Sequence, residues 1–146
     1  MILLAIDPGN VQSAYCYYDT KQQKPIQFTT LTNGSFIETF CEQVVIEKIA
    51  SYGMAVGESI FETCVWTGRL IEKFEHIQIP VDRITRKDVK MHLCGSMRAK
   101  DSNIIQVLKD RFGEKGTKKK PGLLYGIKAD EWQSLALAVT YAETKV

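Results

Sequence analysis

Two acidic residues of this chain follow short apolar runs, and a third precedes an apolar helical pattern. Asp7 comes directly after Ile-Leu-Leu-Ala-Ile and is followed by Pro8-Gly9, and Glu47 comes directly after Val-Val-Ile. Asp130 precedes Glu-Trp-Gln-Ser-Leu-Ala-Leu-Ala. An apolar run closed by turn residues is typical of a buried strand. A carboxylate at its end needs a metal ion, a cationic partner or a proton, because desolvating a lone charge is costly.

These acids have a chemical interpretation and an ordinary structural one. Carboxylates gathered at strand ends and a helix N-terminus can hold Mg²⁺, which prefers hard oxygen ligands. Two such ions can activate a water and stabilise the leaving oxygen in phosphodiester cleavage. Taken singly, each acid is more often a turn former or a helix cap, and Asp130 with Gln133 fits the spacing of a capping box. The similar apolar lead-ins favour the metal site.

The elements that would position the acids follow from hydrophobic periodicity and turn residues. A polar turn spans residues 19–25, and a basic loop spans residues 113–122. The pattern predicts strands at 2–7, 13–19, 26–31, 43–47 and within 77–84, and helices at 35–42, 63–74, 85–92, 100–112 and 130–143. No internal repeat or linker interrupts the chain, so we expect one mixed α/β domain over residues 1–146.

Composition excludes several classes of protein. The 146 residues are 45% hydrophobic and 25% charged, as in an ordinary soluble domain, and the net charge of +2 is too small to indicate nucleic-acid binding by itself. The four cysteines lie far apart, which argues against a zinc site or a disulfide framework and favours reduced, mostly buried thiols. With no signal peptide and no apolar run of membrane-spanning length, we expect a cytoplasmic protein.

Basic residues are concentrated in two segments. The first lies between residues 83 and 100, where Asp88 is the only acid, and the second lies in the 113–122 loop. Such clusters bind phosphates and release counterions, although a basic run in a loop is also commonly a solvated surface. The residues are Arg83, Arg86, Lys87, Lys90, Arg98 and Lys100 in the first segment and Lys115, Lys118, Lys119 and Lys120 in the second.

The ordered set of motifs resembles the RuvC family of Holliday-junction resolvases, most closely its shorter bacteriophage members. The resemblance rests on Ile-Asp7-Pro8-Gly9, Val-Val-Ile-Glu47, Gly95-Ser-Met-Arg-Ala-Lys100 and the segment from Asp130 to Ala138. It implies an RNase H-like fold, a five-stranded mixed sheet flanked by helices. It also implies a homodimer that nicks branched DNA with Mg²⁺ or Mn²⁺, in the host cytoplasm if the protein is phage-encoded.

The resemblance also assigns roles to particular residues. Asp7, Glu47 and Asp130 are implied to be metal ligands, and Lys100 is implied to approach the scissile phosphate. Tyr52 follows the second acid and would stack on a base near the exchange point, although core packing is an equal alternative. The helix at 63–74 would contribute to the dimer interface, unless its apolar stripe packs within the chain. The implied DNA-binding residues are Tyr52, Arg83, Arg86, Lys87, Lys90, Arg98, Lys118, Lys119 and Lys120.

Position 133 departs from the family pattern, which has an acid three residues after Asp130. Gln133 offers only a neutral amide, a weaker ligand than a carboxylate. The glutamine can be natural, with Asp101 or Glu131 as the last ligand, or an engineered replacement, or the site can use a single ion. Glu131 is the poorer substitute because it lies about 100° around the helix from Asp130.

We therefore expect a metal-dependent, structure-specific endonuclease that cleaves Holliday junctions with two ions and leaves 5′-phosphate and 3′-hydroxyl ends. One alternative is a nuclease of the same fold that acts on forks, flaps or three-way junctions. Another is a junction-binding protein whose site is impaired by Gln133. A sugar-kinase or actin-like ATPase shares the strand-turn opening but needs a glycine-rich phosphate loop that this chain lacks. No segment indicates a protein-docking motif.

Overall fold

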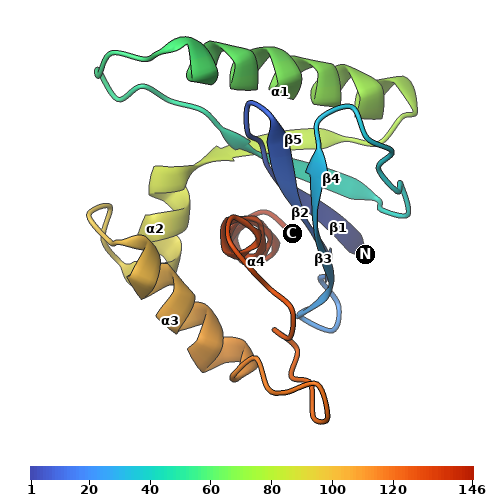
Figure 1. The fold of residues 1–146 in the computed structure, drawn as a ribbon, viewed down its shortest axis with the longest axis vertical. Coiled ribbons are helices and arrows are strands. Elements are labelled where there is room, and N and C mark those ends of the chain that lie inside the picture. The colour runs from blue at the N-terminus through green and yellow to red at the C-terminus, as the bar shows by residue number, and fades with distance from the viewer.

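The computed structural model describes residues 1–146 and contains one sheet and four helices (Figure 1). The elements are β1 (Ile2–Asp7), β2 (Gln12–Asp19), β3 (Lys24–Thr32), β4 (Gln43–Lys48), α1 (Glu58–His76), β5 (Val81–Thr85), α2 (Arg86–Cys94), α3 (Asp101–Phe112) and α4 (Glu131–Thr144). The predicted strands are confirmed with small shifts at their ends. The helix predicted at 63–74 is longer, because it begins at Glu58.

The helix predicted at 35–42 is wrong, because this segment contains no helix. Its residues pack against and hydrogen-bond to β2 instead. Ile37 is buried, the Phe40 ring stacks on Tyr17 with 4.4 Å between ring centroids, and the Tyr17 hydroxyl donates to the Glu38 carbonyl at 2.7 Å. These long-range contacts outweigh the local helical preference of a segment too short to be stable alone.

The five strands lie in the order β3-β2-β1-β4-β5. β2 is antiparallel to both β1 and β3, whereas β4 is parallel to β1 and β5 is parallel to β4. The sheet is therefore mixed, as predicted, and β1 lies at its centre. Ile6 pairs with Ile46 in register, so the carboxyl ends of β1 and β4 lie side by side.

Successive residues of β1 point to opposite faces of the sheet, and each face has its own apolar core. Leu4 and Ile6 pack on the α1 side, where α1 contributes buried residues that include Trp66 and Phe74. Leu3 and Ala5 pack on the other side with α2, α3 and α4. In Figure 1, α1 covers one side of the sheet, and α4 lies between the sheet and the pair α2 and α3.

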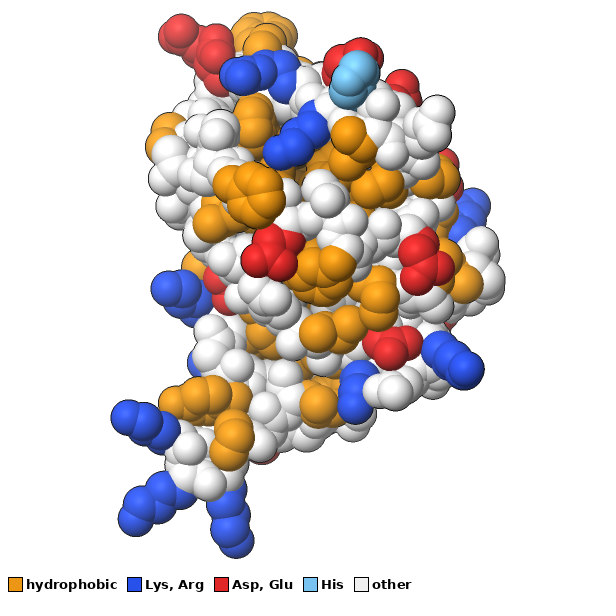
Figure 2. Space-filling view, turned by 90° about the vertical axis from the view of Figure 1, so that its right-hand side faces the viewer, with side chains coloured by type: hydrophobic (Ala, Val, Ile, Leu, Met, Phe, Trp, Pro, Cys, Tyr) orange, Lys and Arg blue, Asp and Glu red, His pale blue; other side chains and the backbone are white.

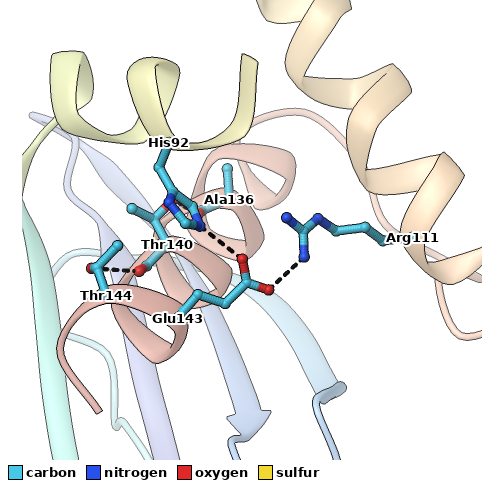
Figure 3. Close-up of polar contacts among 6 residues, drawn as sticks. All are labelled: His92, Arg111, Ala136, Thr140, Glu143 and Thr144. Carbon is cyan, nitrogen blue, oxygen red and sulfur yellow. Dashed lines mark hydrogen bonds and ion pairs between the residues drawn. The ribbon is translucent and has the colours of Figure 1, made fainter. Parts of the chain in front are cut away.

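The sandwiched helix α4 is buried from Glu131 to Tyr141. Near its end, Glu143 accepts hydrogen bonds from His92 of α2 and Arg111 of α3, so one carboxylate joins three helices (Figure 3). Tyr141 donates to Asp82 of β5 at 2.6 Å. These contacts fix the C-terminal end of α4 against α2, α3 and β5.

The predictions drawn from the cysteine content are confirmed only in part. All four cysteines are free, as predicted, but only Cys16 is fully buried, and Cys64 is exposed on α1. The prediction of mostly buried thiols is therefore wrong. No helix combines the length and apolar character needed to cross a membrane.

Candidate active site at the ends of β1 and β4

Asp7 and Glu47 are the last residues of the predicted apolar runs and lie at the same edge of the sheet. Each directly follows one member of the Ile6–Ile46 pair, so the two acids are neighbours on adjacent parallel strands. Because Ile6 and Ile46 face α1, the side chains of the acids point to the other face, which α4 covers. The sequence predicted that both acids lie at strand ends, and the structure shows that these two strands are adjacent.

Asp130 joins the two strand acids from α4. It occupies the N-cap position of that helix, but its side chain makes no capping hydrogen bond. The capping box predicted for Asp130 and Gln133 is therefore wrong. Ala129, just before it, has a positive φ of 49°, a conformation that residues with a Cβ adopt at a cost. The carboxylate of Asp130 is exposed and available to a ligand.

The acids act on one another strongly. Burial raises the pKa of Asp7 to about 8, and the negative charges of Glu47, Asp130 and Asp101 contribute further to the rise. Burial likewise raises the pKa of Glu47, with further contributions from Asp130 and Asp101. The positive charge of Arg86 opposes the rise at both acids. A bound divalent cation would relieve this crowding of like charges.

The donors at this edge suit a hard cation, since they are carboxylate oxygens. No three His, Cys, Asp or Glu side chains converge on one point in the structure. Ligation by Asp7, Glu47 and Asp130 therefore requires their side chains to rotate toward a common ion.

Gln133 lies on α4 one turn after Asp130 and is 8% exposed. Its amide makes no side-chain hydrogen bond within the chain, so no structural contact accounts for the glutamine. Of the two acids considered as substitutes, Glu131 accepts hydrogen bonds from the Thr30 hydroxyl at 2.6 Å and the Lys128 amide at 3.3 Å. Glu131 thus joins α4 to β3. Asp101 is the substitute whose charge acts on Asp7 and Glu47.

The basic residues are distributed unevenly around the acids. Arg86, the first residue of α2, acts on Asp7 and Glu47, and Lys90, one turn later, acts on Glu47. Lys100 is exposed at the N-cap of α3, where its backbone amide donates to Asn103, and it is not among the cations that act on the two strand acids. The ammonium of Lys87 lies over the Tyr52 ring, 4.1 Å from its centroid.

The other predicted DNA-binding residues lie at the surface. Arg83 of β5 and Arg98 before α3 are exposed. Lys118, Lys119 and Lys120 belong to the loop that hangs below α3 in Figure 1. Figure 2 shows Lys and Arg side chains gathered at this lower tip of the molecule (Figure 2). Tyr52 is 45% exposed, so the alternative of core packing is wrong.

A hydrogen-bond network behind Asp7 was not apparent from the sequence. The Ser13 hydroxyl accepts from the Trp66 indole at 3.0 Å and from the Gly9 amide at 3.2 Å, and donates to Asn33 at 2.8 Å. Asn33 donates in turn to the Gly9 carbonyl at 2.8 Å. A Cβ at Gly9 would lie 2.2 Å from the Gln12 carbonyl oxygen. The turn after Asp7 is thus fixed by β2, β3 and α1 and requires glycine.

Comparison with solved structures identifies the architecture. Thermus thermophilus RuvC superposes with a TM-score of 0.74 at 16% identity, over 97% of this chain and 93% of that chain. The chain has the fold of RuvC. The RNase H-like fold predicted from the sequence is thereby confirmed.

Two further structures with the RuvC-like architecture contain DNA. T. thermophilus RuvC in complex with a Holliday junction substrate gives a TM-score of 0.73 at 16% identity, again over 97% and 93% of the two chains. A fowlpox virus resolvase in complex with Holliday junction DNA gives 0.60 at 19% identity, over 99% of this chain and 98% of that chain. No family model and no curated protein sequence matches the chain.

Proposed function

We propose that this chain is a metal-dependent, structure-specific endonuclease that cleaves Holliday junctions and other branched DNA. The observation that carries the proposal is the pair Asp7 and Glu47 at the carboxyl ends of adjacent parallel strands, with Asp130 acting on both. The RuvC fold supports it, since structures similar to this one include resolvases bound to Holliday junction DNA.

Asp7, Glu47 and Asp130 would hold the metal, and Gln133 or Asp101 would complete the ligand set. Two Mg²⁺ or Mn²⁺ ions, when bound, supply a nucleophilic water and stabilise the charge on the leaving oxygen. The acids would hold the ions at the edge of the sheet where β1 and β4 end. Lys100 and the cations of α2 would neutralise the negative charge that develops on the phosphate. The products expected are 5′-phosphate and 3′-hydroxyl ends.

The surface around the acids would bind the DNA backbone. The proposed contacts are Tyr52, Arg83, Arg86, Lys87, Lys90, Arg98, Lys118, Lys119 and Lys120. Tyr52 would stack on an unpaired base. Because Lys87 lies over one face of the Tyr52 ring, a base must either displace this ammonium or use the other face.

A homodimer would bring two such sites to opposite strands of a four-way junction, as symmetrical resolution requires. α1 offers the surface for it. Phe61 and Val65, one turn apart on its outer side, are 59% and 60% exposed, and Cys64 and Gly68 lie beside them. We expect a second copy of the chain to cover this side of α1.

The direct experiment is a nicking assay with labelled four-way junctions, forks, flaps and linear duplex, each with Mg²⁺ or Mn²⁺. The wild-type protein should nick branched substrates in preference to linear duplex, and Asp7→Asn should abolish nicking. Asp110→Asn, which removes an exposed carboxylate of α3, is the matched control and should retain activity. Full Mg²⁺-dependent nicking by Asp7→Asn would refute the proposal. Equal cleavage of forks and flaps would favour the broader nuclease.

A second candidate function is junction binding with an impaired catalytic site. Gln133 favours it, because an amide stands at the fourth acid position and makes no hydrogen bond that would explain it. The Gln133→Glu variant separates the candidates when Mn²⁺ affinity, junction affinity and nicking are measured together. A steep gain in metal affinity and nicking at unchanged DNA affinity would identify residue 133 as the missing ligand. No gain in metal affinity would assign that place to another group, such as Asp101.

A further inference from the structure

Arg86 is hydrogen-bonded at one end of its guanidinium group and enclosed by the protein at the other. Its Nη2 donates to Oδ1 of Asp101 at 2.7 Å, a contact that joins the start of α2 to the start of α3. Its Nε is enclosed by the protein and makes no hydrogen bond. Enclosing a donor without an acceptor is costly, so an arginine with a purely structural role would not be expected here.

The remaining nitrogen of Arg86 faces outward. The side chain is 36% exposed, and Nη1 makes no hydrogen bond within the chain while Nε is the only enclosed nitrogen without a partner. The positive charge acts on both Asp7 and Glu47. One accessible donor nitrogen, Nη1, therefore lies on a cation that acts on both strand acids.

Arg86 suits a phosphate better than the neighbouring cations do. A group of carboxylates repels a phosphodiester, so a phosphate that approaches Asp7 and Glu47 needs a cation next to them. The Lys87 ammonium already lies over Tyr52, and a lysine offers a flexible point charge. A guanidinium whose plane is already fixed loses less entropy when it binds a phosphate oxygen.

We propose that Arg86 binds a DNA phosphate at the acid site through Nη1, and that Asp101 is the positioning residue that holds the guanidinium in place. This inference rests on the proposed function, since it requires DNA at the acids. It assigns Arg86 a defined partner within the site and separates it from the basic residues of the outer surface.

The test measures DNA affinity without catalysis. Binding to a four-way junction is titrated in EDTA at several salt concentrations, for the wild type and for Arg86→Gln/Asp101→Asn, which preserves the net charge. Losing one phosphate contact should lower the slope of log K against log salt by about 0.9. Affinity should fall by roughly 10- to 150-fold, the value of one charge-assisted hydrogen bond. Arg86→Lys keeps the charge beside Asp7 and should retain the slope, with affinity reduced by roughly threefold.

The matched control is Lys109→Gln/Glu114→Gln, which removes an ion pair on the other end of α3 and should leave slope and affinity unchanged. A wild-type slope in Arg86→Gln/Asp101→Asn would overturn the inference, because Arg86 would then only neutralise Asp101. Wild-type affinity in Arg86→Lys would overturn the assignment to the guanidinium. Wild-type protein that binds linear duplex and junction equally would contradict the proposed function, while the Arg86 comparison would still be decided on either DNA.

Discussion

Asp7 gives a prediction about stability that does not depend on activity. Burial beside Glu47 and Asp130 raises its pKa from 3.8 to about 8. Folding at neutral pH therefore costs free energy at this side chain. At neutral pH without divalent ions, Asp7 must either bind a proton or remain charged among other carboxylates. Asp7→Asn removes the titrating carboxyl group and its charge, and it keeps the size of the side chain. We expect the substitution to stabilise the metal-free protein.

The sign follows from proton binding. Between pH 3.8 and about 8, the folded state holds a proton on Asp7 that the unfolded state has lost. The free energy of unfolding therefore falls as pH rises through this range and levels off above it. A tenfold change in proton affinity is worth about 1.4 kcal/mol, so the upper limit for the penalty is roughly 6 kcal/mol. Rotation of the side chain toward solvent reduces it, and we expect a gain of about 1–3 kcal/mol.

The assay is urea unfolding in EDTA at pH 5, 7 and 9, followed by far-UV circular dichroism. The gain from Asp7→Asn should be small at pH 5 and largest at pH 9. Asp110→Asn, on the exposed surface of α3, should change the free energy of unfolding by less than about 0.5 kcal/mol at each pH. Added Mg²⁺ should stabilise the wild type more than Asp7→Asn, because ligand binding to the folded state adds to its stability.

A loss of stability in Asp7→Asn at pH 9, or a gain that does not vary with pH, would refute this reasoning. The first result would mean that the Asp7 charge makes a favourable contact in the folded protein. The second would mean that Asp7 does not titrate between the two pH values. Either outcome would remove the electrostatic argument for a cation site at these strand ends.

Three further predictions concern the scaffold around the acids. Ser13→Ala leaves the Trp66 indole and the Gly9 amide without their shared acceptor and should cost about 1–3 kcal/mol in urea unfolding; an unchanged midpoint would contradict the network. Ala129→Gly relieves the positive φ before Asp130 and should raise stability by up to about 1 kcal/mol, whereas a clear loss would argue against that backbone conformation. Burial raises the pKa of Glu143, but hydrogen bonds from His92 and Arg111 outweigh it and lower the pKa overall. The stability Glu143 provides should therefore be lost as pH falls below about 4.5, and Glu143→Gln should weaken this acid dependence in thermal melts.

Local patterns were sufficient for most of the fold. The apolar run before Asp7 identified β1, and the helical pattern from residue 85 identified α2, whose start the structure caps with Thr85 and Asp88. The segment 35–42 was misread because its structure depends on Tyr17, which lies far away in the sequence. Local propensity cannot register a contact of that kind.

The candidate site was predictable to the extent that strand ends reveal it. Asp7 and Glu47 were identified because an acid after an apolar run is conspicuous, and parallel pairing then brought them together. The contacts of Glu131 and Arg86 could not be predicted from the sequence. The Glu131 carboxylate accepts a hydrogen bond from Thr30 of β3, and Arg86 of α2 donates to Asp101 of α3. Helical spacing made Glu131 the poorer substitute for a ligand, but only the fold shows that its carboxylate bonds to Thr30.

The hydrogen bond from Trp66 to Ser13 connects helix α1 to the turn that follows Asp7. Trp66 lies on α1, the helix whose outer side we expect a second copy to cover, and its indole donates to the hydroxyl that also holds the Gly9 amide. One indole and one hydroxyl thus connect the inner side of α1 to the turn that follows Asp7. If two copies pair through α1 as proposed, any displacement of this helix would be transmitted to the turn after Asp7 through these two hydrogen bonds.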